Sequence, residues 1–407
     1  MSTARAAEAA DLRSAAQAIQ PEVVAVRRRL HRIPEIGLVL PQTQRLVADE
    51  LAGMGLSPVL GSAVGSVTAV IEGRRPGRTI ILRGDMDGLP LTEETDLDFS
   101  SQHAGAMHAC GHDTHVAMLL GAARLLAARS GDYPGRVVLM FQPGEEGYHG
   151  ARFMLEDGLL TLAGDGPGTA AFALHISTQT MTGTINLRPG PLLASADRLL
   201  ITVRGRGGHA SAPHLALDPI AVAAEIVLAL QVMVSRRVDA FDPAVITIAR
   251  ISAGTTNNII PETAVLEGTM RTVSEATRVM VKDLVGRVAR GVADAHGAAV
   301  DVDIEPGYPV TVNDGVFAGF VREVATDVIG SDAVATMAAP IMGAEDFSYV
   351  LQRVPGAMAF LGARPADQPL ATTPQNHSNR VVFDEAALPV GVAMYAAVAL
   401  RYLEADA

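Results

Sequence analysis

The chain has 407 residues, of which 49% are hydrophobic, 19% charged and 4% aromatic, and its formal net charge is −12. At about 100–200 residues per domain this length predicts two or three folding units, and the high apolar content excludes intrinsic disorder. The acidic balance and the lack of a basic run argue against nucleic acid or an anionic membrane surface as a partner.

The first part of the chain indicates strands that alternate with helices. Apolar residues at helical spacing predict helical structure over 11–53, in one run from Leu12 to Leu30 and a second from Thr43 to Met54. Further on, the expected strands are 66–73, 79–87, 136–146 and 170–177, and the expected helices are 112–129 and 149–157. Because these strands are apolar throughout, they are typical of a parallel sheet that is covered on both faces.

The middle of the chain follows a β-α-β-β-α-β order instead. Its expected strands are 197–208, 244–254, 263–272 and 299–307, and its expected helices are 218–237 and 275–297. This order predicts an α/β two-layer sandwich inserted into the first domain, whose own pattern resumes with a strand at 357–363 and a helix at 385–404. We therefore expect an α/β fold in which residues 1–193 and 309–407 form a domain with a parallel or mixed sheet, and residues 194–308 form the insertion.

Side chains with metal-binding chemistry follow the expected strands of the first domain. They are Asp85, Asp87, Glu145, Glu146 and His175, together with His108, Cys110, His112, Asp113 and His115 before one helix and His377 before the last. Ligands bind beyond the carboxyl ends of strands in open parallel sheets. Since carboxylate, imidazole and thiolate groups bind Zn²⁺, Mn²⁺, Co²⁺ or Ni²⁺, the sequence predicts a metal site. Taken singly, each residue also has a simpler interpretation, such as a core histidine or a solvated acidic turn.

Two motifs together are highly specific, HACGHDTHVAML (108–119) and QPGEEG (142–147), and a further matching segment is GDMDGLPLTEET (84–95). With them, nearly the whole chain resembles the M20 metallopeptidase/amidohydrolase family. More narrowly, it resembles the subfamily of hippurate hydrolases, auxin-conjugate hydrolases and bacterial N-acyl-amino-acid amidohydrolases. The resemblance implies a zinc-peptidase-like catalytic domain with an inserted lid or dimerisation domain.

The resemblance also implies roles for particular residues. The residues that match the ligands of a centre of two divalent metal ions are Cys110, His112, Glu146, His175 and His377. Glu145 matches the general base that takes a proton from a bridging water, and Asp87 matches the carboxylate that orients a histidine ligand. The residues that match contacts to the substrate carboxylate or the developing oxyanion are His209, Asn258 and Arg271, and in dimeric relatives some of these come from the partner subunit. His108 and His115 are expected to be supporting residues.

The implied activity is hydrolysis of the amide bond of N-acyl-L-amino acids, either hippurate-like or N-acetyl-amino-acid-like. We expect a cytoplasmic homodimer formed through the insertion, with a small-molecule substrate and no nucleic acid or membrane partner. Three alternatives stay open: a dipeptidase or aminopeptidase of the same family, a hydrolase with Cys110 as the nucleophile, and a non-catalytic metal-dependent binding protein. A mechanism with Cys110 as the nucleophile leaves four residues without roles: Glu145, Glu146, His175 and His377.

Overall fold

The computed structural model describes residues 3–164 and 168–405. The described chain divides into two compact units. Unit 1 comprises the residues up to 190 together with 312–338 and those from 349 onwards, and unit 2 comprises residues 191–311 and 339–348.

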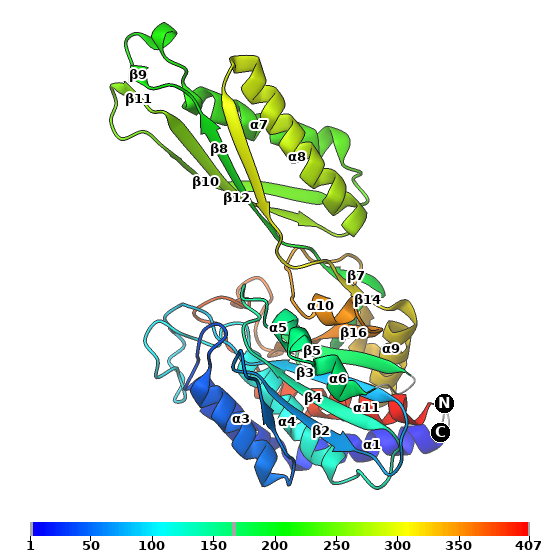
Figure 1. Ribbon diagram of the computed structural model, residues 1–407. Helices are drawn as coiled ribbons and strands as arrows, with labels where there is room; N and C mark the ends of the chain where they lie inside the picture. Colours follow the sequence, from blue (N-terminus) through cyan, green and yellow to red (C-terminus); the bar gives the residue numbers. More distant parts are fainter. Residues whose placement is uncertain (1–2, 165–167, 406–407) are drawn as a thin grey trace. The chain divides into compact units, whose positions relative to one another are not determined.

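Within the described part of unit 1, eight strands form one mixed sheet (Figure 1). Their order in the sheet is β1 (Val59–Leu60), β2 (Val67–Glu72), β4 (Arg136–Gln142), β3 (Thr79–Asp85), β5 (Thr169–Met181), β16 (Gly356–Arg364), β6 (Ile185–Leu187) and β15 (Val334–Thr336). β3 lies parallel to both β4 and β5, and β5 lies parallel to β16, whereas β2 and β6 run antiparallel to β4 and β16. All seven residues of β3 are buried, as expected for a strand in a parallel sheet that is covered on both faces.

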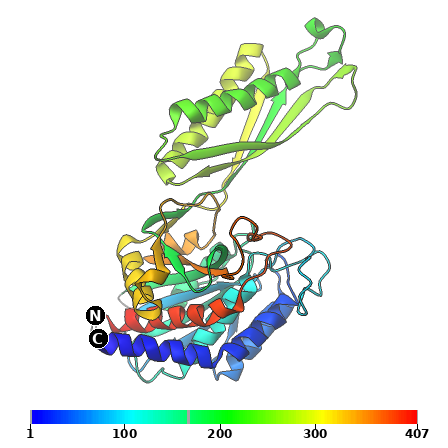
Figure 2. The same ribbon diagram turned by 180° about the vertical axis from the view of Figure 1, so that it is seen from behind.

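Helices cover this sheet on both faces. They are α1 (Thr3–Ala18), α2 (Gln20–His31), α3 (Pro41–Gly53), α4 (His112–Ala127), α5 (Gly150–Glu156), α6 (Leu159–Ala163), α9 (Gly315–Ile329) and α11 (Leu388–Glu404). α4 and α11 pack against each other and against β3, and Figure 2 shows α11 on this face beside α1. α5 and α6 contact β4 and lie on the other face in Figure 1.

The two helical runs expected within 11–53 appear in the structure, the first divided into α1 and α2 and the second as α3. Residues 32–40 between them form a loop that contains Pro34 and Gly37, the latter with φ of +80°. Helix α9 was not expected at all, and β6 and β15 are only three residues long, too short to show a periodicity.

In unit 2, all of whose residues are described, four strands form an antiparallel sheet. Their order is β10 (Ala244–Ala253), β12 (Thr263–Thr272), β8 (Asp197–Arg204) and β13 (Ala299–Glu305), and β10 and β13 are the edges. Helices α7 (Pro219–Arg237) and α8 (Glu275–His296) pack on this sheet, with Leu199, Ile226 and Leu266 in the core between them. The α/β fold class and the β-α-β-β-α-β order of this part are therefore confirmed.

The remaining elements are short. They are β7 (Gly190–Leu193), β9 (Gly208–His209), β11 (Ile259–Ile260), β14 (Thr311–Asn313), α10 (Ser348–Leu351) and the 3₁₀ turns Pro213–Leu215, Ser331–Ala333 and Glu385–Ala387. Among the described residues, two helices are long and apolar enough to cross a membrane by composition alone, α7 and Glu385–Glu404. The second is mostly buried in unit 1, as the core helix of a globular domain is.

Candidate metal centre

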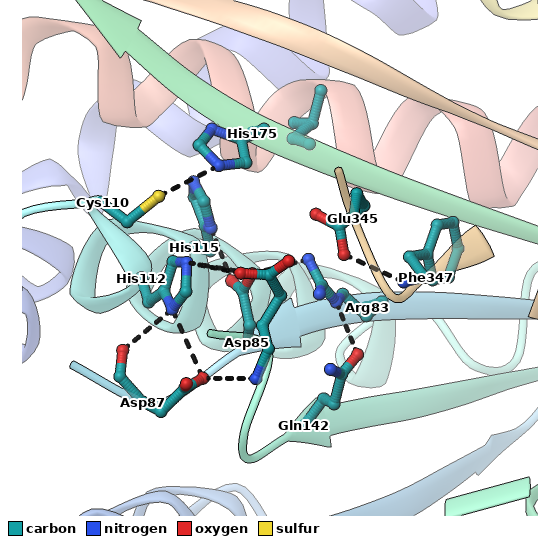
Figure 3. Close-up of polar contacts among 12 residues, drawn as sticks. Arg83, Asp85, Asp87, Cys110, His112, His115, Gln142, His175, Glu345 and Phe347 are labelled. Atoms are coloured by element: carbon teal, nitrogen blue, oxygen red, sulfur yellow. Dashed lines mark hydrogen bonds and ion pairs between the residues drawn. The ribbon is translucent and has the colours of Figure 1, made fainter. Parts of the chain in front are cut away.

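The carboxyl ends of β3 and β4 and the middle of β5 carry predicted side chains to one region of the sheet in unit 1. Figure 3 shows Asp85, Cys110, His112 and His175 close together there. Asp85 is the last residue of β3, Glu145 and Glu146 follow β4, and His175 lies within β5. Cys110 and His112 lie where a loop enters α4. Gly111 between them has φ of +91°, and a Cβ there would lie 2.4 Å from Ile176 Cγ2. Only glycine therefore fits this turn.

The donor atoms of all five predicted metal ligands converge. Cys110 Sγ lies 3.3 Å from His175 Nε2 and 3.2 Å from His377 Nε2. His377 Nε2 lies 3.2 Å from Glu146 Oε1, and His112 Nε2 lies 4.0 Å from that same oxygen. Two groups that share the thiol, Cys110–His112–His175 and Cys110–Glu146–His377, each keep their donor atoms within 4.8 Å of one another. Two overlapping donor sets suit two neighbouring metal ions.

Hydrogen bonds fix the tautomers of two of these histidines. Nδ1 of His112 lies 2.8 Å from the carbonyl oxygen of Asp87, and Nδ1 of His175 lies 2.7 Å from that of Ile176. A carbonyl oxygen only accepts, so in both rings Nδ1 donates its proton, and Nε2 is the nitrogen left to bind a metal ion. Nε2 of His112 is buried and lies 3.3 Å from Asp85 Oδ2, but it forms no hydrogen bond with a described residue. A buried ring nitrogen that faces carboxylates suits a site where a metal ion takes the place of a proton.

His115 has a different role, because both of its ring nitrogens are engaged. Its Nε2 accepts from the backbone N–H of Ile176 at 2.8 Å, so Nδ1 carries the proton and donates to Asp85 at 2.6 Å. Asp85 is fully buried and its other oxygen lies 2.6 Å from the Arg83 guanidinium. Burial raises the pKa of Asp85, but Arg83 and the histidines outweigh it and hold that pKa well below its usual range. Arg83 was not predicted as a site residue, although it lies two residues before Asp85 and therefore on the same face of the strand.

Asp87 holds the two glutamates in place. Its carboxylate accepts the backbone N–H groups of Glu145 and Glu146 at 2.9 and 3.0 Å. The same carboxylate is 3.5 Å from His112 Nδ1, whereas the carbonyl oxygen of Asp87 is only 2.8 Å from it. The Asp87 backbone thus orients the His112 ring, and the Asp87 side chain orients the turn that carries Glu145.

The electrostatics of the site also favour cations. Burial, then Glu146 and Glu145, raise the pKa of the Cys110 thiol well above its usual value. Burial lowers the pKa of His112, but Asp85 and Asp87 outweigh it and raise that pKa to about 10. Four carboxylates and one thiol are concentrated here, and divalent ions would offset their repulsion and bind the thiol as thiolate.

The three expected substrate-binding residues lie in unit 2, but not together. His209 in β9 pairs with Ile259 in β11, and the Asn258 carbonyl accepts from the backbone N–H of Ala210 at 3.1 Å. Arg271 lies near the other end of β12, eight residues beyond Thr263, where the Nε of Arg271 donates to Thr269 Oγ1. At about 3.3 Å per residue this strand separates the two places by roughly 26 Å. A single copy of unit 2 cannot bring all three to one small substrate.

Residues 81–401 match the sequence model of peptidase family M20/M25/M40. Thermostable carboxypeptidase 1 of Saccharolobus solfataricus is 38% identical over 96% of this chain and 98% of its own length. IAA-amino acid hydrolase ILR1-like 4 of Arabidopsis thaliana is 37% identical over 94% of this chain and 86% of its own. N-acetylcysteine deacetylase of Bacillus subtilis is 36% identical over 95% of this chain and 98% of its own.

A similar fold occurs among solved structures. A dinuclear metal-binding M20 peptidase of Bacillus subtilis superimposes with a TM-score of 0.82 and 33% identity, over 95% of this chain and 99% of that one.

Proposed function

The chain belongs to peptidase family M20/M25/M40 and is a hydrolase of amide bonds, and from this premise we propose that it cleaves N-acyl-L-amino acids of the hippurate or N-acetyl-amino-acid type. The observation that carries the proposal is the convergence of five donor side chains beside Glu145, which is absent from both donor sets that contain Cys110. The similarity to an IAA-amino acid hydrolase and an N-acetylcysteine deacetylase supports this substrate class.

We assign the metal ligands to Cys110, His112, Glu146, His175 and His377. The buried Nε2 of His112, which faces carboxylates, and the mixture of thiolate, imidazole and carboxylate suit borderline ions such as Zn²⁺, Mn²⁺, Co²⁺ or Ni²⁺. When bound, two such ions supply Lewis acidity, which makes a water acidic near neutral pH and polarises the amide carbonyl.

Glu145 then serves as the general base. Its carboxylate is buried, and its Oε2 lies 4.0 Å from Nε2 of His112, a residue that would bind a metal ion. The carboxylate accepts a proton from the attacking water and passes it to the amide nitrogen, so that the amino acid leaves as a neutral amine. Asp87 keeps Glu145 oriented by holding its backbone.

Unit 2 supplies the substrate contacts in this proposal. Arg271 forms two hydrogen bonds to the α-carboxylate of the substrate, and His209 and Asn258 stabilise the oxyanion. Because one copy of unit 2 holds them roughly 26 Å apart, the proposal requires His209 and Asn258 from one subunit and Arg271 from the other.

A homodimer through unit 2 meets this requirement. Leu228 and Val232, one turn apart on α7, are 68% and 60% exposed, and β10 offers an open strand edge. A second copy could cover this apolar face and pair with this edge. We also propose that the enzyme works in the cytoplasm, in keeping with its single cysteine.

A peptidase activity is the second candidate, because a carboxypeptidase is 38% identical to this chain. The acyl part of the substrate would then be an amino acid with a free α-amine, as in a dipeptide. Catalysis by Cys110 as a nucleophile is less favoured, since burial and nearby carboxylates raise the pKa of its thiol.

The test is hydrolysis of N-acetyl, benzoyl and longer N-acyl amino acids and of dipeptides by the purified protein. Each substrate is assayed after chelation and after addition of Mn²⁺, Zn²⁺, Co²⁺ or Ni²⁺, with Glu145→Gln as the control. Cleavage of N-acyl amino acids that metal restores and Glu145→Gln abolishes supports the proposal. Activity that survives chelation contradicts the metal mechanism, and cleavage of dipeptides alone favours the second candidate.

A further inference from the structure

Asn376 connects three of the chain segments that carry the proposed metal ligands. Its side-chain amide donates one hydrogen bond to the carbonyl oxygen of Cys110 and one to that of Ile176, both at 3.0 Å. Its Oδ1 accepts from the backbone N–H of Thr178 at 3.4 Å. One amide thus joins the loop before α4, the end of β5 and the loop that contains His377.

The Ile176 carbonyl links Asn376 to the proposed metal ligand His175. It accepts from Asn376 and also from Nδ1 of His175 at 2.7 Å. That second bond keeps the proton of His175 on Nδ1 and leaves Nε2 free to face Cys110. Asn376 therefore fixes the acceptor that sets the tautomer of His175.

The neighbouring His377 depends on the same loop. It has φ of +70°, a conformation that is uncommon for a residue other than glycine. Its backbone N–H donates to the Ala109 carbonyl at 2.9 Å. Strained backbone of this kind persists only where the surroundings fix it, and the Asn376 amide supplies two of those restraints.

We propose that Asn376 is a positioning residue of the metal centre, whose amide holds Cys110, His175 and His377 at ligand spacing. The proposal rests on the proposed metal function. It predicts that the amide is required for metal affinity more than for folding, because most contacts that stabilise unit 1 lie in its apolar core.

The experiment compares Asn376→Ala and Asn376→Asp with the wild type and with Thr178→Val. Asp has the shape of Asn but would set a carboxylate against two carbonyl oxygens. Thr178→Val removes the 2.9 Å bond from Thr178 Oγ1 to Pro374, which ties the same loop, and leaves the Asn376 amide intact. Each metal-free protein is titrated with Zn²⁺ by calorimetry, the thiolate-to-metal absorption is recorded with Co²⁺, and folding is followed by circular dichroism.

The expected result is a loss of Zn²⁺ affinity of about 10–100-fold in both Asn376 variants. A weaker cobalt–thiolate absorption should accompany it, while Thr178→Val stays within about threefold of the wild type. Zn²⁺ affinity in folded Asn376→Ala equal to that of the wild type overturns the proposal, as does an equal loss in Thr178→Val. A wild-type protein that binds no Zn²⁺ or Co²⁺ overturns the proposed metal function as well, so the two failures are distinguishable.

Discussion

Cys110 Sγ and His377 Nε2 lie 3.2 Å apart although 267 positions separate the two residues in the chain. Both also approach a third group, since Glu146 Oε1 is 3.2 Å from the same nitrogen. A thiol, an imidazole and a carboxylate from three distant segments thus face one another. Their convergence leads to predictions that separate metal binding, catalysis and assembly.

The first prediction concerns the shared ligand. Cys110→Ser should lower both the affinity for Zn²⁺ and the activity by at least about 10-fold, because the thiolate belongs to both donor sets. Loss of a residue that only hydrogen-bonds to a metal ligand already lowers metal affinity by about 10–100-fold. Metal content by mass spectrometry and steady-state kinetics measure the two effects. Full metal content with no activity would point instead to Cys110 as a nucleophile.

The second prediction isolates the proton transfer. Glu145→Gln should lower kcat by about 10²–10⁴-fold, the usual contribution of a general base. The metal content of Glu145→Gln should be largely retained, because the two donor sets that contain Cys110 do not include Glu145, although Glu145 also lies in a further set with His112 and Glu146. Glu146→Gln is the matched control, because the adjacent carboxylate is a proposed ligand and its loss should reduce metal content. An equal loss of metal in both variants would contradict the assignment of roles.

The third prediction concerns assembly. Leu228→Glu places a charge on the exposed apolar face of α7 and should dissociate the proposed dimer, as sedimentation velocity would report. Activity should fall with the dimer while Zn²⁺ affinity stays at the wild-type value, because all five ligands lie in unit 1. Glu225→Gln, an exposed change on the same helix, serves as the control. A fully active monomer would show that one subunit suffices.

The fourth prediction tests a buried ion pair in unit 2. Asp197 is buried and pairs with Arg278 at 2.8 Å and with Lys282 at 2.9 Å. Asp197→Asn leaves these cations without their counter-charge and should cost about 3–5 kcal/mol of unfolding free energy, measured with urea. The adjacent Arg198→Gln breaks an exposed pair with Glu305 and should cost less than about 1 kcal/mol. Equal losses of unfolding free energy in Asp197→Asn and Arg198→Gln would contradict the prediction.

The fifth prediction is a pH dependence of stability at Glu93. Burial raises the pKa of this carboxyl, but hydrogen bonds from His31, Thr95 and the backbone of Ser101 outweigh it and lower that pKa from 4.5 to about 2. A depressed carboxyl pKa stabilises the fold above pH 4.5, and this stabilisation is lost as the pH falls toward 2. Glu93→Gln should therefore be less stable than the wild type at pH 6, and the difference should narrow below pH 4.5. Urea unfolding at several pH values measures the difference in unfolding free energy between Glu93→Gln and the wild type. A difference that stays constant from pH 6 to below pH 4.5 would contradict the prediction.

Much of the fold followed from local patterns. The apolar strand 79–87, the helix 112–129 and the β-α-β-β-α-β order of the middle segment appear in the structure within a few residues of their expected ends. The bounds of the inserted segment and its role as a lid stay predictions. The strands of three residues or fewer were not predicted, because such short elements show no periodicity. Helix α9 was overlooked although it has 15 residues and its buried apolar residues recur at helical spacing.

By itself the sequence determined which donor types follow which strands, since a motif such as HACGHDTH carries its chemistry in a few adjacent residues. The tertiary structure decided what each group can do. The contacts of Asp87 and Ile176 set the tautomers of His112 and His175, and the length of β12 separates Arg271 from His209. Such relations depend on hydrogen bonds and distances between segments that the parallel sheet brings together, and no local pattern encodes them.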